Sequence, residues 1–122
     1  MILIDTSIWI EHLRYGDPIL VGLLNAGRVL THPFVIGEIA LGILRHRERV
    51  IDLLSDLPSA TPANNEEILS FISTQGLYGR GIGYVDAHLL AATQLTAGAS
   101  LWTKDRRLAQ TATELGISAR FD

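Results

Sequence analysis

The sequence predicts an α/β protein in which a mostly parallel sheet has helices on both faces. Short apolar runs of strand length, "ILI", "RVLTH" and "SLWT", are separated by longer stretches of helical periodicity. Strands separated by helices in this way are typical of parallel pairing through crossover connections. The length of 122 residues suits one core, so we expect a single domain over residues 1–122.

The N-terminal half contains the first two expected strands. A strand over residues 2–4 leads into a helix over residues 7–14, and "GDP" ends that helix and starts a second one that runs to about Asn25. After "RVLTH", Pro33 opens a third helix that we expect to extend through "PFVIGEIALGILRHR", and "RERVIDLLSDL" continues as a fourth. The proline-bounded "PSATPA" could hold a brief edge strand.

The C-terminal half repeats the alternation. A capped helix is expected from Asn64 or Asn65 to about Thr74, followed by a flexible loop with four glycines between Gly76 and Gly83. The segment "YVDAHLLAATQL" is helical and "AGA" ends it. The strand "SLWT", the helix "KDRRLAQTATELG" and a final strand "ISARF" complete the expected fold.

Composition excludes several classes of protein. There are no cysteines, so disulfides, thiolate nucleophiles and cysteine metal sites are absent, which suits a cytoplasmic protein. No apolar run approaches the ~20 residues that span a bilayer, and no membrane association is expected. The net charge of −3 argues against broad nonspecific binding to nucleic acid, but not against a nuclease whose metal ions supply positive charge.

Four acids stand out by their position. Asp5 follows the first strand, where an open α/β sheet binds ligands, and it can also cap the helix that begins there. Glu38 lies in a strongly apolar helix, so we expect a half-buried carboxylate that needs a partner. Asp86 lies near the start of another helix, where an acid also interacts favourably with the helix dipole, and Asp105 follows "SLWT".

A shared divalent cation would neutralise these acids. No Lys or Arg is placed within the apolar segments to pair with Glu38 or Asp86. Oxygen ligands without His or Cys suit Mg²⁺ or Mn²⁺. The four acids therefore predict a bound Mg²⁺ or Mn²⁺ ion as cofactor.

Four segments, "ILIDTSIW", "VIGEIALG", "YVDAHLLAA" and "LWTKDRRL", resemble the acidic motifs of PIN-domain nucleases in order and spacing. The "DTS", "E…G", "D…AA" and "T.D…L" patterns are most similar to VapC toxins of toxin–antitoxin pairs. The resemblance implies a three-layer sandwich and a Mg²⁺- or Mn²⁺-dependent endoribonuclease. It also implies a homodimer, and a cognate antitoxin that lies across the active-site groove.

The resemblance also implies roles for individual residues. Metal-binding and catalytic acids would be Asp5, Glu38, Asp86 and Asp105, with Thr6, Ser7 and Thr103 as supporting hydroxyls. Gly42 would permit close helix packing. A metal-activated water would attack phosphorus in line, and the family implies products with a 5′-phosphate and a 3′-hydroxyl.

Substrate contacts are expected from basic groups near two of the acids. Lys104 and Arg106 flank Asp105, and Arg45 lies in "RHRER", a segment that equally suits a solvated helix end. Tyr78 and Tyr84 could stack bases of single-stranded RNA. Trp9 and Trp102 are assigned to the core, and the four histidines to structural roles.

Three other functions fit parts of the pattern. A haloacid-dehalogenase-type phosphatase needs alternating aspartates, whereas "DTS" has one. A phosphoacceptor receiver domain needs an Asp that ends a central strand, whereas Asp52 lies in a helical pattern. A metal-stabilised module that binds RNA or protein without cutting uses the same acids as the nuclease, and sequence does not separate the two.

Overall fold

The computed structural model describes residues 1–121 and contains a parallel sheet of three strands in the order β2-β1-β3. The strands are β1 (Ile2–Ile4), β2 (Val29–Leu30) and β3 (Ser100–Trp102). Leu3 lies opposite Leu30 on one side and Leu101 on the other. Because both pairings are parallel, the carboxyl ends of all three strands meet at one edge of the sheet.

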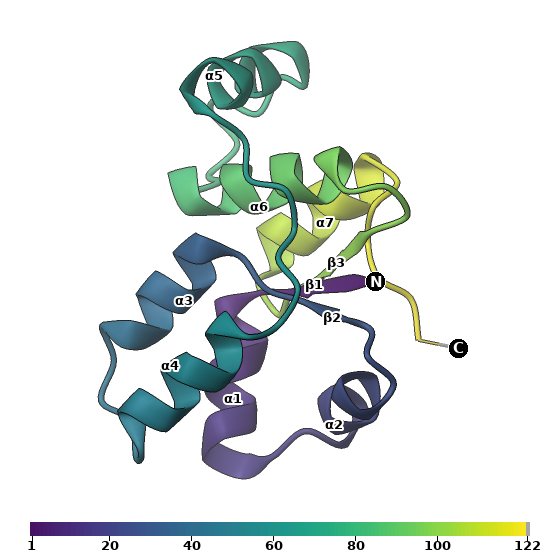
Figure 1. Ribbon diagram of the computed structural model, residues 1–122. Helices are drawn as coiled ribbons and strands as arrows, with labels where there is room; N and C mark the ends of the chain where they lie inside the picture. Colours follow the sequence, from purple (N-terminus) through teal and green to yellow (C-terminus); the bar gives the residue numbers. More distant parts are fainter. Residues whose placement is uncertain (122) are drawn as a thin grey trace.

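Helices cover both faces of this sheet, as the sequence predicts. Figure 1 shows α6 and α7 on one side, α1 and α4 on the other, and α5 outside α6. Their bounds are α1 (Thr6–Tyr15), α2 (Pro18–Asn25), α3 (Pro33–Ala40), α4 (Arg47–Ser55), α5 (Asn65–Thr74), α6 (Tyr84–Leu95) and α7 (Arg106–Glu114). The three-layer α/β sandwich is confirmed.

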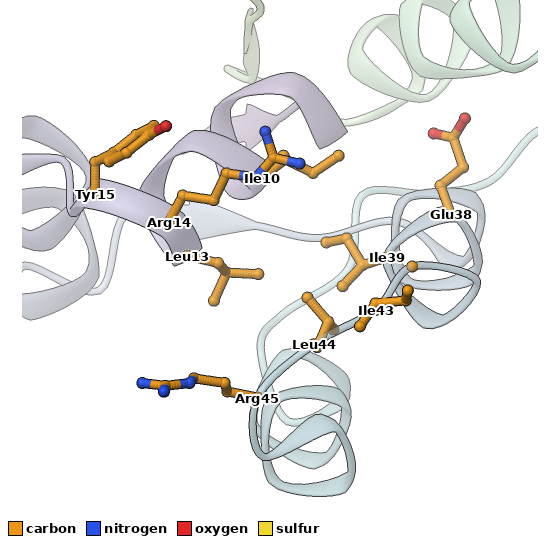
Figure 2. Close-up of a pocket in the computed structure, with 10 residues that line it drawn as sticks. Ile10, Leu13, Arg14, Tyr15, Glu38, Ile39, Ile43, Leu44 and Arg45 are labelled. Carbon is orange, nitrogen blue, oxygen red and sulfur yellow. The ribbon is translucent and has the colours of Figure 1, made fainter.

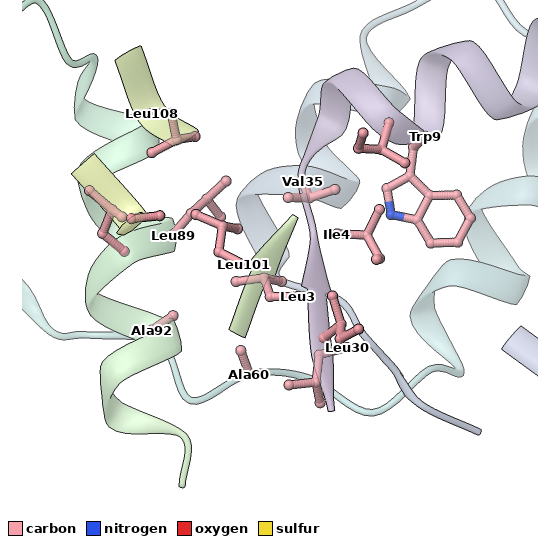
Figure 3. Packing of buried hydrophobic residues seen from close by; sticks show 14 of the residues in the cluster. Leu3, Ile4, Trp9, Leu30, Val35, Ala60, Leu89, Ala92, Leu101 and Leu108 are labelled. Atoms are coloured by element: carbon pink, nitrogen blue, oxygen red, sulfur yellow. The ribbon is translucent and has the colours of Figure 1, made fainter. Parts of the chain in front are cut away.

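The central strand is buried on both faces. Ile2, Leu3 and Ile4 are all buried, as expected for a parallel strand between two helical layers. Successive side chains point to opposite faces, so Leu3 lies toward Leu89 of α6 whereas Ile4 lies toward Trp9 of α1 (Figure 3). This burial holds the end of β1, where Asp5 follows, in a rigid frame.

Local capping explains several helix boundaries. The Asp17 side chain accepts hydrogen bonds from the backbone N–H groups of Ile19 and Leu20 at the start of α2. Asn64 and Glu67 form a capping box at the start of α5. Both helix starts were therefore readable from sequence.

The third helix is shorter than expected. It ends at Ala40, and Leu41 and Ile43, which we expected on apolar helix faces, are 89% and fully exposed. The guanidinium of Arg47 donates to the Ala40 carbonyl at 2.8 and 3.1 Å and so satisfies the helix end. Gly42 lies in the turn and an added Cβ would meet only the Ile39 carbonyl, so the expected close helix packing there is wrong.

The expected brief edge strand in "PSATPA" and the expected final strand "ISARF" each contain a single bridge. Thr31 pairs with Ser59 of "PSATPA", and Leu101 pairs with Ser118 of "ISARF". The prediction of a final strand over "ISARF" is therefore wrong. Only Ser118 of this segment forms a bridge to β3, and its neighbours do not continue the ladder. Over the part of the chain that the structure describes, no helix has the length and apolar character needed to cross a membrane.

Candidate active site

Four acids reach the carboxyl edge of the sheet from separate elements. Asp5 directly follows β1, Glu38 lies in the last turn of α3, Asp86 in the first turn of α6, and Asp105 at the N-cap of α7. Asp5 is buried with 6% exposure and Asp86 is partly buried. Glu38 and Asp105 are exposed, so the expectation of a half-buried Glu38 is wrong: the carboxylate leaves the apolar side of α3 and points outward.

Asp5 is held by two hydroxyl groups. Ser7 Oγ and Thr103 Oγ1 each donate to Asp5 Oδ2 at 2.7 Å, and Thr103 Oγ1 also accepts from the Asp105 backbone N–H at 3.0 Å. The Asp5 side chain makes no capping hydrogen bond to α1, so that expected second role is wrong. Thr103 instead connects the first acid to the last across 98 positions of sequence.

Glu38 and Asp105 show the same division between their two oxygens. Thr6 Oγ1 donates to Glu38 Oε1 at 2.6 Å, and the Leu108 backbone N–H donates to Asp105 Oδ1 at 2.9 Å. Within residues 1–121, no hydrogen bond reaches the second oxygen of Asp5, Glu38 or Asp105. Each carboxylate is thus oriented through one oxygen and has the other oxygen available to a ligand.

Electrostatics shows that the four acids act on one another. Burial raises the pKa of the Asp86 carboxyl above its ordinary value, and the negative charges of Asp5, Asp105 and Glu38 raise it further. A hydrogen bond from the Gly83 backbone opposes this increase in the pKa. The ion pairs found in the described residues are Arg80 with Glu114 and Lys104 with Glu11, and neither includes these four acids. Negative charge therefore accumulates here without a basic side chain to balance it.

The donor set fits a hard divalent cation. It consists of carboxylate oxygens, which Mg²⁺ and Mn²⁺ prefer. Across residues 1–121, no three His, Cys, Asp or Glu side chains are close enough together to form a ready-made metal site. The four acids share an electrostatic field, and Mg²⁺ usually keeps several waters while one or two carboxylates bind it.

The expected basic residues lie in three different environments. Lys104 pairs with Glu11 of α1, and its backbone N–H donates to Ser7 Oγ at 3.1 Å. Arg106 is exposed in the first turn of α7. Arg45 lines a cavity of about 540 Å³ that also contains Glu38, and the two side chains point away from each other in Figure 2.

The same cavity includes residues that the sequence did not single out. Arg14 and the exposed Tyr15, both from α1, line it opposite the turn that follows α3 (Figure 2). No local pattern marks them, since they lie at an ordinary helix end before "GDP". Their relation to Glu38 arises only when α1 packs beside α3.

Histidines and tryptophans have mainly structural surroundings. His32 and His88 are buried, and His32 Nδ1 accepts from the Phe34 backbone N–H at the start of α3. His12 Nδ1 accepts from the Asp17 backbone N–H. Trp9 is buried, whereas Trp102 is only partly buried.

The glycine loop before α6 is attached to α7. Gly81 has a left-handed φ of 74°, and a Cβ added there would collide with the guanidinium of Arg107. Arg80 and Glu114 form an ion pair between the same two segments. Arg107, which was not among the expected substrate contacts, therefore packs on the loop that precedes Asp86.

The α/β sandwich agrees with the fold that the resemblance of the four sequence motifs implied. A family model described as "PIN domain" matches residues 2–114, and the chain belongs to the PIN domain family. Two relatives named "Ribonuclease VapC32", from the CDC 1551 / Oshkosh and ATCC 25618 / H37Rv strains of Mycobacterium tuberculosis, are each 46% identical over 118 residues. The match covers 97% of this chain and 95% of each relative. The predicted resemblance to PIN-domain nucleases of the VapC type is confirmed.

Proposed function

We propose that this protein is a Mg²⁺- or Mn²⁺-dependent endoribonuclease of the VapC toxin type, which acts in the cytoplasm and hydrolyses RNA phosphodiester bonds by in-line attack of water. The observation that carries the proposal is that Asp5, Glu38, Asp86 and Asp105 come from separate elements near the carboxyl edge of the sheet, and the raised pKa of the Asp86 carboxyl agrees with it. Four mutually repelling acids without a basic partner suit a cation-binding role. The relatives named as ribonucleases support RNA as the substrate.

Asp5, Glu38, Asp86 and Asp105 would hold the cation. A bound divalent ion would supply positive charge to the scissile phosphate and lower the pKa of a water so that hydroxide is available near neutral pH. Through Ser7 and Thr103, the protein fixes Oδ2 of Asp5 and leaves Oδ1 for the ion or its waters.

Two further contacts orient the remaining exposed carboxylates. Thr6 holds Oε1 of Glu38, and the N-terminus of α7 holds Oδ1 of Asp105. Substrate phosphates would be bound by Lys104, Arg106 and Arg45. Lys104 would have to exchange its ion pair with Glu11 for a phosphate, which an exposed pair permits at little cost.

The proposal includes a cognate antitoxin and a homodimer. The cavity beside Glu38 is lined by Ile10, Leu13 and Ile43 together with Arg14. Each of the three apolar side chains is more than a third exposed, which suits an apolar segment of a protein inhibitor. A segment bound there would lie next to one of the catalytic acids.

The test is cleavage of total tRNA and structured RNA by purified, antitoxin-free protein in Mg²⁺, Mn²⁺ or EDTA. We expect discrete fragments with 5′-phosphates in the presence of metal, and their loss in EDTA and in Glu38→Gln. Glu66→Gln removes an equally exposed acid from α5 and should cut like the unchanged protein.

Absence of cutting by folded protein that still binds Mg²⁺ would contradict the enzymatic proposal. The same result would favour the second candidate, a metal-stabilised module that binds RNA or protein without cleavage. That candidate uses the same four acids, so binding of Mg²⁺ alone does not separate the two functions.

A further inference from the structure

Two exposed aromatic rings lie on the helices that carry Glu38 and Asp86. Phe34 of α3 is 38% exposed and Tyr84 of α6 is 54% exposed. Both rings pack edge-on against the buried ring of His88, with centroid distances of 4.6 Å for Phe34 and 4.7 Å for Tyr84. His88 is 4% exposed, so it supports both rings from below.

The two rings lie on the facing sides of the two helices that carry Glu38 and Asp86. Phe34 precedes Glu38 by four residues in α3, and side chains four apart lie on the same side of a helix. Tyr84 precedes His88 by four residues in α6, so it lies on the side of α6 from which His88 contacts Phe34 of α3. An RNA strand whose phosphate reaches Glu38 would therefore pass close to Phe34, and close to Tyr84 because both rings contact His88.

We propose that Phe34 and Tyr84, supported by His88, form a stacking site for one unpaired nucleobase next to the scissile phosphate. This inference rests on the proposed ribonuclease function and specifies its substrate as single-stranded at that nucleotide. An unpaired base offers a flat face to aromatic side chains, whereas a base inside a duplex is already stacked.

The charge of the site gives a physical reason for such a contact. Four carboxylates repel the phosphates of an approaching strand, and the chain carries a net charge of −3. Stacking on uncharged rings adds affinity without adding a cation that would compete for the acids. The edge-on contacts with His88 also fix the rings before the base arrives, which lowers the entropy cost of ordering them.

Tyr78 provides the matched control. It is 72% exposed in the glycine loop, and among residues 1–121 its ring contacts no other aromatic ring. Exposure alone would make it a better stacking partner than Tyr84. If RNA binding depends on Tyr84 and not on Tyr78, the contact with His88 and not exposure alone decides which ring stacks on the base.

The experiment measures binding of a short single-stranded RNA that carries one 2-aminopurine, in Mg²⁺ and in the Glu38→Gln background. Cleavage is assayed separately in protein that retains Glu38, so failure to cut and failure to stack give different results. We expect Tyr84→Leu to weaken binding about tenfold and to remove the fluorescence quenching at one nucleotide position. Tyr84→Phe should retain both. Tyr78→Leu should change neither, because this proposal, unlike the sequence-based expectation that both tyrosines stack bases, assigns no base to Tyr78.

A second comparison replaces the quenched nucleotide by an abasic one. This RNA should bind about tenfold more weakly to the background protein but no more weakly to Tyr84→Leu, since that variant has already lost the contact. Phe34→Leu, checked for folding by thermal unfolding, should behave like Tyr84→Leu. If the abasic substitution weakens RNA binding equally in the background protein and in Tyr84→Leu, the proposal is overturned. It is also overturned if Tyr84→Leu changes the oligomeric state or antitoxin binding and leaves RNA binding unchanged.

Discussion

Thr103 is the most informative residue to change, because its hydroxyl joins two of the acids. It donates to Asp5 Oδ2 at 2.7 Å and accepts from the Asp105 backbone N–H at 3.0 Å. Thr103→Val keeps the shape of the side chain and removes both bonds. A hydrogen bond to a charged group contributes about 1.5–3 kcal/mol.

We expect a loss near the lower end of that range, about 1.5 kcal/mol, because Thr103 is only partly buried and water can replace its contact with Asp105. For a domain of this size, this loss corresponds to a decrease in Tm of about 6 °C. Thermal and urea unfolding measure it. The matched control is Thr113→Val, which removes an exposed hydroxyl bonded to the Ala109 carbonyl of the same helix.

Thr103→Val should also lower the rate of RNA cleavage, and by more than the loss of folded protein explains. With one of its two donors removed, Asp5 is free to turn Oδ2 away from its present position, and loss of such supporting contacts typically costs 10–100-fold in metal affinity or rate. Thr103→Ser should restore most of both. Equal stability and equal cleavage by Thr103→Val and Thr113→Val would refute the idea that the hydroxyl orients Asp5.

Three further predictions test the fold around the site. Gly81→Ala should destabilise the protein by about 1–2 kcal/mol because φ is 74°, whereas Gly22→Ala inside α2 should stabilise it slightly; urea unfolding compares them. Burial and then the charge of His88 lower the pKa of His32 from 6.5 to about 4. The contribution of His32 to the free energy of unfolding should therefore be constant above pH 6.5 and decrease as pH falls toward 4, by on the order of 3 kcal/mol in total. An unchanged pH profile in His32→Asn would contradict this assignment. Asn64→Ala should lose about 1 kcal/mol by removing the cap of α5, and hydrogen exchange should locate the loss in that helix.

Local sequence patterns predicted most elements correctly. Asp17, Pro18 and Asn64 mark helix starts because side-chain acceptors and a fixed proline φ act within a few residues. The third helix was overestimated because "IALGIL" continues the apolar pattern beyond its end at Ala40. Residue type alone does not distinguish an isoleucine in an exposed turn, such as Ile43, from an isoleucine in the core.

Candidate acids could be chosen from sequence, but not their environments. Glu38 was expected to be half-buried because its neighbours are apolar, yet α3 turns Val35 and Ile39 inward and leaves the carboxylate exposed. Lys104 was expected to be available to RNA, and the packing of α1 brings Glu11 to it. The wrong burial of Glu38 and the unforeseen ion pair of Lys104 have the same origin, because the surroundings of both residues were inferred from their neighbours along the chain.

The sequence by itself determined the α/β class, the alternation of strands and helices that indicates a parallel sheet, and the choice of the four candidate acids. Periodicity and strand ends are local properties of the chain, so they can be recognised without the fold. Only the tertiary structure decided which oxygens of Asp5, Glu38 and Asp105 are held, that Thr103 bonds to Asp5, and that Phe34 and Tyr84 both contact His88. Such contacts join residues far apart in sequence. Their geometry depends on how helices pack on the sheet, which no local pattern specifies.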